Sequence, residues 1–200
     1  MIVSQARPLA LAVAPPGLWV RAVLVALGSA LIALAAQIAI PLPFSPVPVT
    51  GQTFAVLLVA AALGPRFGPA SVALYVVEGL IGLPVFAGGT SGLARIAGPT
   101  GGYLAGFIMA AYVVGLLAER GWDRRIWTCV LAMLAGEVVI YVFGLAGLSR
   151  FPLPNGVLEA GLLPFVIGDA YKLALAAIAL PAAWRLVPGH GTHAGSLRAR

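Results

Sequence analysis

Two residues of opposite charge lie three positions apart in an otherwise apolar stretch near the C-terminus. Asp169 and Lys172 occur in the run PFVIGDAYKLALA. Residues three apart share one face of a helix, so the two side chains can neutralise each other. Because the carboxylate accepts hydrogen bonds and the ammonium donates them, the pair suits an uncharged ligand group with both N–H and C=O. A purely structural pair is the alternative, although buried pairs often add little stability.

Three further charged residues stand in apolar or glycine-rich surroundings. Glu78 and Glu137 lie in apolar runs, where each could line a polar cavity or take part in a helix contact. Arg95 lies in a glycine-rich segment. Its guanidinium could bind a carboxylate, or it could face lipid headgroups.

Catalysis is not expected. Residues 89–92 match the Gly-x-Ser-Gly pattern of rhomboid intramembrane proteases, but a serine nucleophile needs a base nearby. The histidines, His190 and His193, belong to the polar C-terminal tail, and Cys129 is the single cysteine. These residues cannot assemble a metal site, and the sequence has no phosphate-binding Gly-x-x-x-x-Gly-Lys motif. We therefore predict no catalytic residues, no metal and no cofactor.

The composition is that of an integral membrane protein. Hydrophobic residues make up 61% of the 200 residues and charged residues 9%, against about 45–50% and about 25% in soluble domains. The net charge of +6 comes mainly from arginines spread along the chain rather than from a basic block. We therefore expect no nucleic-acid partner. The lipid bilayer is the expected partner.

Six apolar segments approach the roughly 20 residues that a spanning helix needs. They are residues 22–40, 49–63, 69–83, 103–118, 126–148 and 162–187. The second and third are short and flank the sequence GPRFG, so tilted or broken helices are expected there. The prediction is an all-α integral membrane protein with six transmembrane helices.

The arginines indicate how these helices are oriented. With a cytoplasmic N-terminus, one side carries Arg7, Arg21, Arg66, Arg120, Arg124, Arg125, Arg185, Arg198 and Arg200. The other side carries Arg95 and Arg150. Because positive residues accumulate in cytoplasmic loops, both termini are predicted to be cytoplasmic. The expected parts are a cytoplasmic segment 1–20, a membrane domain 21–187 and a cytoplasmic tail 188–200.

The outer loops of this topology are the unusual ones. Residues 41–52 are rich in proline, and residues 84–102 are rich in glycine and hydroxyl groups. Irregular backbone near a bilayer is tolerated where it is buried in protein or lines a cavity. We therefore expect a ligand to enter from outside.

Small residues also recur every four positions. Gly98, Gly102 and Gly106 form one such ladder, and a second one lies on the first predicted helix, at Ala22, Ala26 and Ala30. Such spacing allows helices to pack closely. The alanine ladder could pack internally or dock another membrane subunit.

Several motifs together resemble the BioY family of biotin-binding S components of energy-coupling factor (ECF) transporters. They are PVPVTGQT at 46–53, GLPVFAGGTSG at 82–92, GPTGGYLAGF at 98–107 and Gly-Asp-x-x-Lys at 168–172. The resemblance covers about residues 20–187. It implies a six-helix protein of the bacterial cell (plasma or inner) membrane that captures biotin from outside. It also implies as partners a transmembrane coupling subunit and two cytoplasmic ATPases.

The resemblance assigns roles to individual residues. It implies that Asp169 and Lys172 hold the ureido ring of biotin, with Thr90 as a polar partner, and its motifs add Gln52 and Tyr103 to the expected contacts. It further implies that the coupling subunit docks on the ladder of Ala22, Ala26 and Ala30.

Some positions depart from the family pattern. Leu104 stands where some members carry an arginine suited to the biotin carboxylate, so Arg95 is our substitute candidate. Glu137 stands where a small or amide residue is expected. Two other functions stay open: an S component for another small vitamin, and a channel or proton-coupled carrier that uses Glu137 and Asp169 as relay groups.

Overall fold

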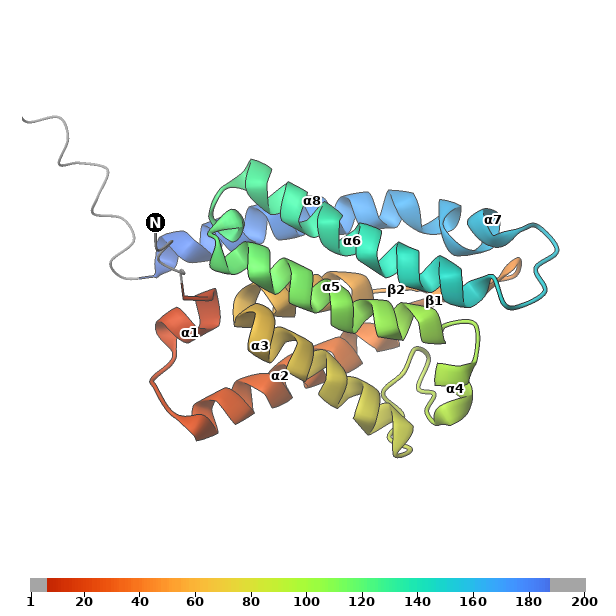
Figure 1. Ribbon diagram of the computed structural model, residues 1–200, viewed down its shortest axis with the longest axis horizontal. Coiled ribbons are helices and arrows are strands. Elements are labelled where there is room, and N and C mark those ends of the chain that lie inside the picture. The colour runs from red at the N-terminus through yellow and green to blue at the C-terminus, as the bar shows by residue number, and fades with distance from the viewer. Residues whose placement is uncertain (1–6, 188–200) are drawn as a thin grey trace, which may run out of the picture.

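The computed structural model describes residues 7–187, which form a bundle of long helices (Figure 1). In chain order the elements are α1 (Leu9–Val13), α2 (Leu18–Gln37), β1 (Ala39–Leu42), β2 (Ser45–Thr50), α3 (Gln52–Leu80), α4 (Leu93–Ala97), α5 (Gly101–Glu119), a 3-10 turn (Trp122–Arg124), α6 (Ile126–Leu148), α7 (Val157–Gly161) and α8 (Leu163–Leu186). The predicted tail 188–200 lies outside the described residues. Segment 1–20 is described from residue 7 onward, and it contains α1 and the start of α2.

Within the described residues, five helical stretches are long and apolar enough to cross a membrane. They are α2, α3, α5, α6 and the stretch Val157–Leu186, with mean hydropathies between 1.5 and 2.2. The mostly helical architecture predicted from the sequence is therefore confirmed, and these five stretches are candidate membrane spans. Two predicted spans, 49–63 and 69–83, fall together in α3.

Helix α3 folds back on itself at Gly64. This residue has φ +76° and ψ −175°, values that are not helical. Gln52 and Tyr75 would be about 35 Å apart in a straight helix, yet their side chains share a hydrogen bond of 2.6 Å. Gly68 lies so close to Ala60 that a Cβ at position 68 would be 2.9 Å from the Ala60 Cα. The arms before and after Gly64 therefore lie antiparallel.

Two predicted helix boundaries, on either side of the proline-rich segment, are wrong. The first predicted span, 22–40, ends as a helix at Gln37, and the second begins at Gln52 rather than at residue 49. Between them β1 and β2 form an antiparallel hairpin with Ala39 opposite Thr50. Prolines cannot donate a ladder hydrogen bond, but each strand of a two-stranded sheet has a free edge where they are tolerated. The all-α expectation therefore misses this hairpin.

Glycines bring the central helices into backbone contact. A Cβ at Gly106 of α5 would be 3.1 Å from the Ile140 Cα of α6, and one at Gly115 would be 2.5 Å from the Gly64 carbonyl carbon. Part of the glycine ladder on α5 thus packs inside the chain. On α2, by contrast, the side chains of Ala22, Ala26 and Ala30 are all exposed.

The loops gather at the two ends of the bundle. The β-hairpin, α4 and α7 lie at one end, and α1 lies at the other, where the described chain also finishes (Figure 1). The described chain therefore begins and finishes at the same end, opposite the proline-rich and glycine-rich segments.

Candidate functional site

A cavity lies between the helices, beneath the hairpin and the segment that contains α4. All six predicted ligand-binding residues line it: Gln52, Thr90, Arg95, Tyr103, Asp169 and Lys172. Much of the remaining wall is apolar, including Val47, Phe86, Phe107, Ile140 and Phe165. An apolar hollow with a few convergent polar groups is typical of a small-molecule site.

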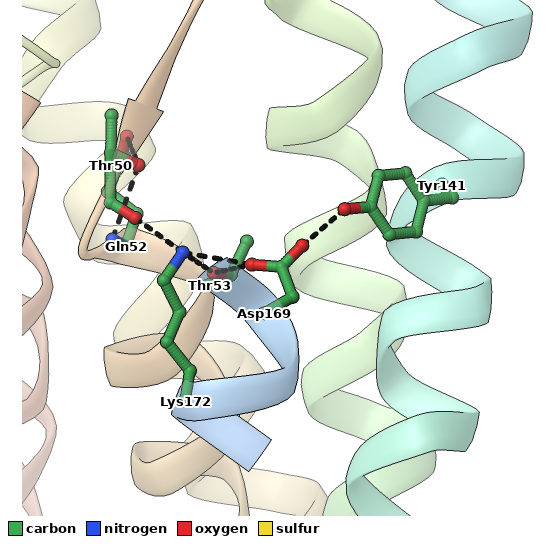
Figure 2. Close-up of polar contacts among 6 residues, drawn as sticks. All are labelled: Thr50, Gln52, Thr53, Tyr141, Asp169 and Lys172. Carbon is green, nitrogen blue, oxygen red and sulfur yellow. Dashed lines mark hydrogen bonds and ion pairs between the residues drawn. The ribbon is translucent and has the colours of Figure 1, made fainter. Parts of the chain in front are cut away.

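The Lys172 ammonium is held by three acceptors (Figure 2). Its Nζ lies 2.9 Å from Asp169 Oδ1, 2.7 Å from the Thr50 carbonyl oxygen and 2.9 Å from Thr53 Oγ1. An ammonium has three N–H donors, so this geometry fixes the head group. The bonds reach from α8 to the end of β2 and the start of α3, which the turn at Gly51 joins.

The Asp169 carboxylate is bonded from three sides. Besides Lys172, the Thr53 hydroxyl donates to Oδ1 over 3.3 Å, and the Tyr141 hydroxyl of α6 donates to Oδ2 (Figure 2). Asp169 is 5% exposed. A carboxylate so deeply buried is stable when it is paired and hydrogen-bonded, and this network supplies both conditions.

Thr53 and Tyr141 were not among the predicted site residues. Thr53 is the last residue of the PVPVTGQT motif, and Tyr141 lies one helical turn beyond Glu137. A search for polar residues on one face of each apolar helix would have found Tyr141. Only the structure, and not the sequence, shows that this face is turned toward α8.

Gln52 is linked, through Tyr75, to the loop of residues 81–92 that forms part of the cavity wall. Its Nε2 donates to the Tyr75 hydroxyl over 2.6 Å. The Tyr75 ring meets the Phe86 ring edge-on, with 5.5 Å between centroids. Phe86 lies against Gly79, where a Cβ would come within 2.1 Å of the Phe86 ring. The buried Phe86 side chain is thus one anchor of this loop.

The same loop places Thr90 at the cavity. Phe86 and Thr90 form an isolated antiparallel bridge. The turn between them uses Gly88 and Gly89 at φ +69° and +70°, values that glycine adopts without strain. The Thr90 hydroxyl donates to the Ala87 carbonyl oxygen over 3.0 Å.

Tyr103 contributes its ring to the wall. Its hydroxyl donates to the Gly161 carbonyl oxygen over 2.7 Å. The ring packs on Gly144, where a Cβ would lie 2.4 Å away. Tyr103 therefore ties α5 to α6 and to the end of α7, and its hydroxyl already has a protein partner.

Arg95 is the cationic group at the rim. It is exposed on α4 and lines the cavity. Within residues 7–187 its guanidinium is in no ion pair. Leu104, at the position where some family members carry an arginine, is buried in the apolar wall.

The remaining acidic candidates lie outside the cavity lining. Glu78 Oε2 accepts a hydrogen bond of 2.6 Å from Ser29 of α2. Glu137 is 4% exposed, and its carboxylate has no hydrogen-bond partner in the described part of the chain. His190 and His193 lie outside the described residues. Among the residues from 7 to 187, no group of three His, Cys, Asp or Glu side chains could hold a metal ion.

Comparisons with known proteins agree with these features. The model of the BioY family matches residues 11–189. A probable biotin transporter BioY of Pyrococcus horikoshii is 43% identical over 155 residues, covering 78% of this chain and 90% of that protein. The biotin transporter BioY of Thermotoga maritima is 43% identical over 152 residues, covering 75% and 87%.

A solved structure is also similar. It is a crystal structure of the S-component for biotin from an ECF-type ABC transporter. The two folds superpose with a TM-score of 0.72 at 27% sequence identity, over 82% of this chain and 90% of that one.

Proposed function

The chain belongs to the BioY family, and we propose that it is the biotin-capture S component of an ECF transporter. It is a membrane transport protein and not an enzyme. The observation that carries the proposal is the buried network of Asp169, Lys172 and Thr53 in the cavity wall. It presents both acceptors and donors to a ligand in an apolar hollow.

Biotin fits this chemistry group by group. Its ureido ring is neutral and carries two N–H groups and one C=O, which match the Asp169 carboxylate and the Lys172 ammonium. Because the three protons of Lys172 already have acceptors, the ureido oxygen replaces one of them. The apolar sulfur-containing ring and alkyl chain of biotin lie against the aromatic wall, with Thr90, Tyr103 and Gln52 around them.

The carboxylate of biotin needs a cation or several N–H donors. Arg95 is exposed at the rim and lines the same cavity as Asp169. We assign the carboxylate to Arg95. Biotin is then bound with its ring inside and its acid group toward the loops.

We infer the membrane topology from the fold-back of α3 together with the distribution of arginines. The arms on either side of Gly64 count as two crossings, which makes six transmembrane helices. Both chain termini are cytoplasmic, so the cavity opens on the outer side of a bacterial plasma (inner) membrane. In this reading 1–20 and 188–200 are cytoplasmic segments on a membrane domain of 21–187.

Transport into the cell needs partners that supply energy. The exposed row of Ala22, Ala26 and Ala30 on α2 lies on a helix that is mostly uncovered by the rest of the chain. A face of small residues permits another helix to approach closely. We assign this face to a transmembrane coupling subunit, which works with two ATPase subunits.

Competition binding tests the choice of ligand. Radiolabelled biotin is bound to membranes that contain the full chain, and unlabelled vitamins are added in excess. Displacement by biotin, and none by riboflavin or thiamine, is the expected result. Displacement by another vitamin at lower concentration than biotin would assign the cavity to that vitamin. No saturable binding of any of them would leave the carrier hypothesis as the better account.

A further inference from the structure

A second hollow lies on the outer surface of the bundle, between α5 and α6. Its lining comes from the end of α4 and its connection to α5, the start of α5, the last turns of α6 and the residues just after α6. These residues are Ile96, Ala97, Gly98, Gly101, Gly102, Ala105, Phe143, Ala146, Gly147, Arg150 and Phe151. These residues are distinct from those of the biotin cavity. Ala105, Phe143, Ala146 and Arg150 are exposed, so the groove opens away from the bundle.

Two glycines make the groove deep. A Cβ at Gly102 would lie 2.9 Å from the Gly147 Cα, and one at Gly147 would lie 2.7 Å from the Gly102 Cα. The floor is therefore backbone against backbone, with no side chain in between. Figure 1 shows α5 and α6 side by side along this line, with α4 at the same end.

The groove is basic at one end and apolar along the helices. Its one charged residue, Arg150, lies two residues beyond Leu148, the last residue of α6, and is thus just past the helix end. Phe143 and Ala105 lie deeper, several Å along the helices at 1.5 Å per residue. Among the described residues Arg150 forms no ion pair, and no acidic residue lines the groove.

We infer that this groove binds one anionic phospholipid from the leaflet on the side of the biotin cavity. A spanning helix meets the headgroup region at its end and the acyl chains along its length. The phosphate then pairs with Arg150, and one acyl chain fills the hollow over Gly102 and Gly147. Charge complementarity selects an anionic headgroup over a zwitterionic one.

Native mass spectrometry of the purified full chain tests this inference. Phosphatidylglycerol and phosphatidylcholine of identical acyl chains are titrated against the protein in detergent. The expected result is a saturable adduct of one phosphatidylglycerol, formed with about fivefold preference over phosphatidylcholine. Equal binding of both lipids, or many adducts without saturation, would overturn the assignment.

Matched variants locate the site. Arg150→Ala is expected to abolish the preference for phosphatidylglycerol, whereas Arg66→Ala removes an exposed arginine at the bend of α3 and is expected to keep it. Ala105→Trp fills the groove and is expected to remove the adduct. Met109→Trp, one turn further along α5 and outside the groove, is expected to retain it.

Biotin binding by each variant serves as the test of folding. An equal loss of preference in both arginine variants would indicate general surface charge and would contradict a site at Arg150. An adduct that survives Ala105→Trp in a folded protein would also contradict it.

Discussion

The Tyr141 hydroxyl of α6 donates a hydrogen bond to the Asp169 carboxylate of α8. Lys172 occupies the other carboxylate oxygen, at 2.9 Å. With the bond from Thr53 of α3, the acid at the centre of the candidate site is therefore oriented by one residue of its own helix and by residues of two other helices. Its position depends on how α6 and α8 pack, and not on α8 alone.

Tyr141→Phe is expected to weaken biotin binding without unfolding the protein. The change removes the donor to Asp169 Oδ2 and keeps the ring that lines the cavity. A hydrogen bond to a charged group contributes about 1.5–3 kcal/mol, which corresponds to a loss of roughly 10- to 100-fold in affinity. Isothermal titration calorimetry measures this loss. Tyr112→Phe, on the exposed face of α5, is the control, and an equal loss in both would contradict the role.

Thr53 provides a test of the bridge between the two charges. Its hydroxyl accepts from Lys172 and donates to Asp169. Thr53→Val keeps the shape and removes both bonds, so the affinity for biotin is expected to fall about tenfold. Thr53→Ser keeps the hydroxyl and is expected to bind nearly as well as the wild type. If valine and serine behave alike in a filter-binding assay, the hydroxyl has no part in the site.

The role of Arg95 predicts that its substitution affects two related ligands differently. If its guanidinium binds the biotin carboxylate, then Arg95→Ala weakens binding of biotin by about 10- to 100-fold. Binding of biotin methyl ester, which has no carboxylate, is then unaffected by the same change. Comparing the two ligands in one competition assay isolates the contribution of the biotin carboxylate. A loss of equal size for both ligands would show that Arg95 acts through the loop structure instead.

Ala26→Trp tests the docking face on α2. The alanine is exposed and does not line the biotin cavity. A large ring there is expected to block co-purification with a coupling subunit and its ATPases, because close helix packing needs small residues. Biotin binding by the isolated chain is expected to stay unchanged. Val23→Trp is an exposed control on the same helix but outside the ladder. Normal assembly of Ala26→Trp would exclude this face.

Much of the helical framework could be predicted because the bilayer imposes it. The boundaries of α6, Ile126–Leu148, match the prediction, and those of α5 and α8 agree within two residues. The β-hairpin was missed because its prolines indicated an irregular loop and its apolar ends, residues 39–40 and 49–50, were counted with the flanking spans. The antiparallel packing at Gly64 depends on a backbone conformation at one residue, which hydropathy does not report.

The candidate site was predictable where its residues are close in sequence. Asp169 and Lys172 share a helix face by spacing alone, and the family motifs supplied Gln52, Thr90 and Tyr103. Thr53 and Tyr141 were missed because their contacts with α8 join residues more than 25 positions apart. Such contacts depend on how each helix is rotated about its axis. An apolar helix with a low hydrophobic asymmetry gives little indication of that rotation.

The most direct test of the central claim is calorimetric titration of biotin into the purified full chain and into Asp169→Asn. Glu78→Gln is the matched control, since it makes the same chemical change at a carboxylate outside the cavity. We expect tight one-to-one binding by the wild type and by Glu78→Gln, and a loss of at least about 100-fold in Asp169→Asn. Unchanged affinity in a folded Asp169→Asn protein would contradict the assignment of the ureido group to Asp169. No binding by the wild type would contradict biotin as the ligand.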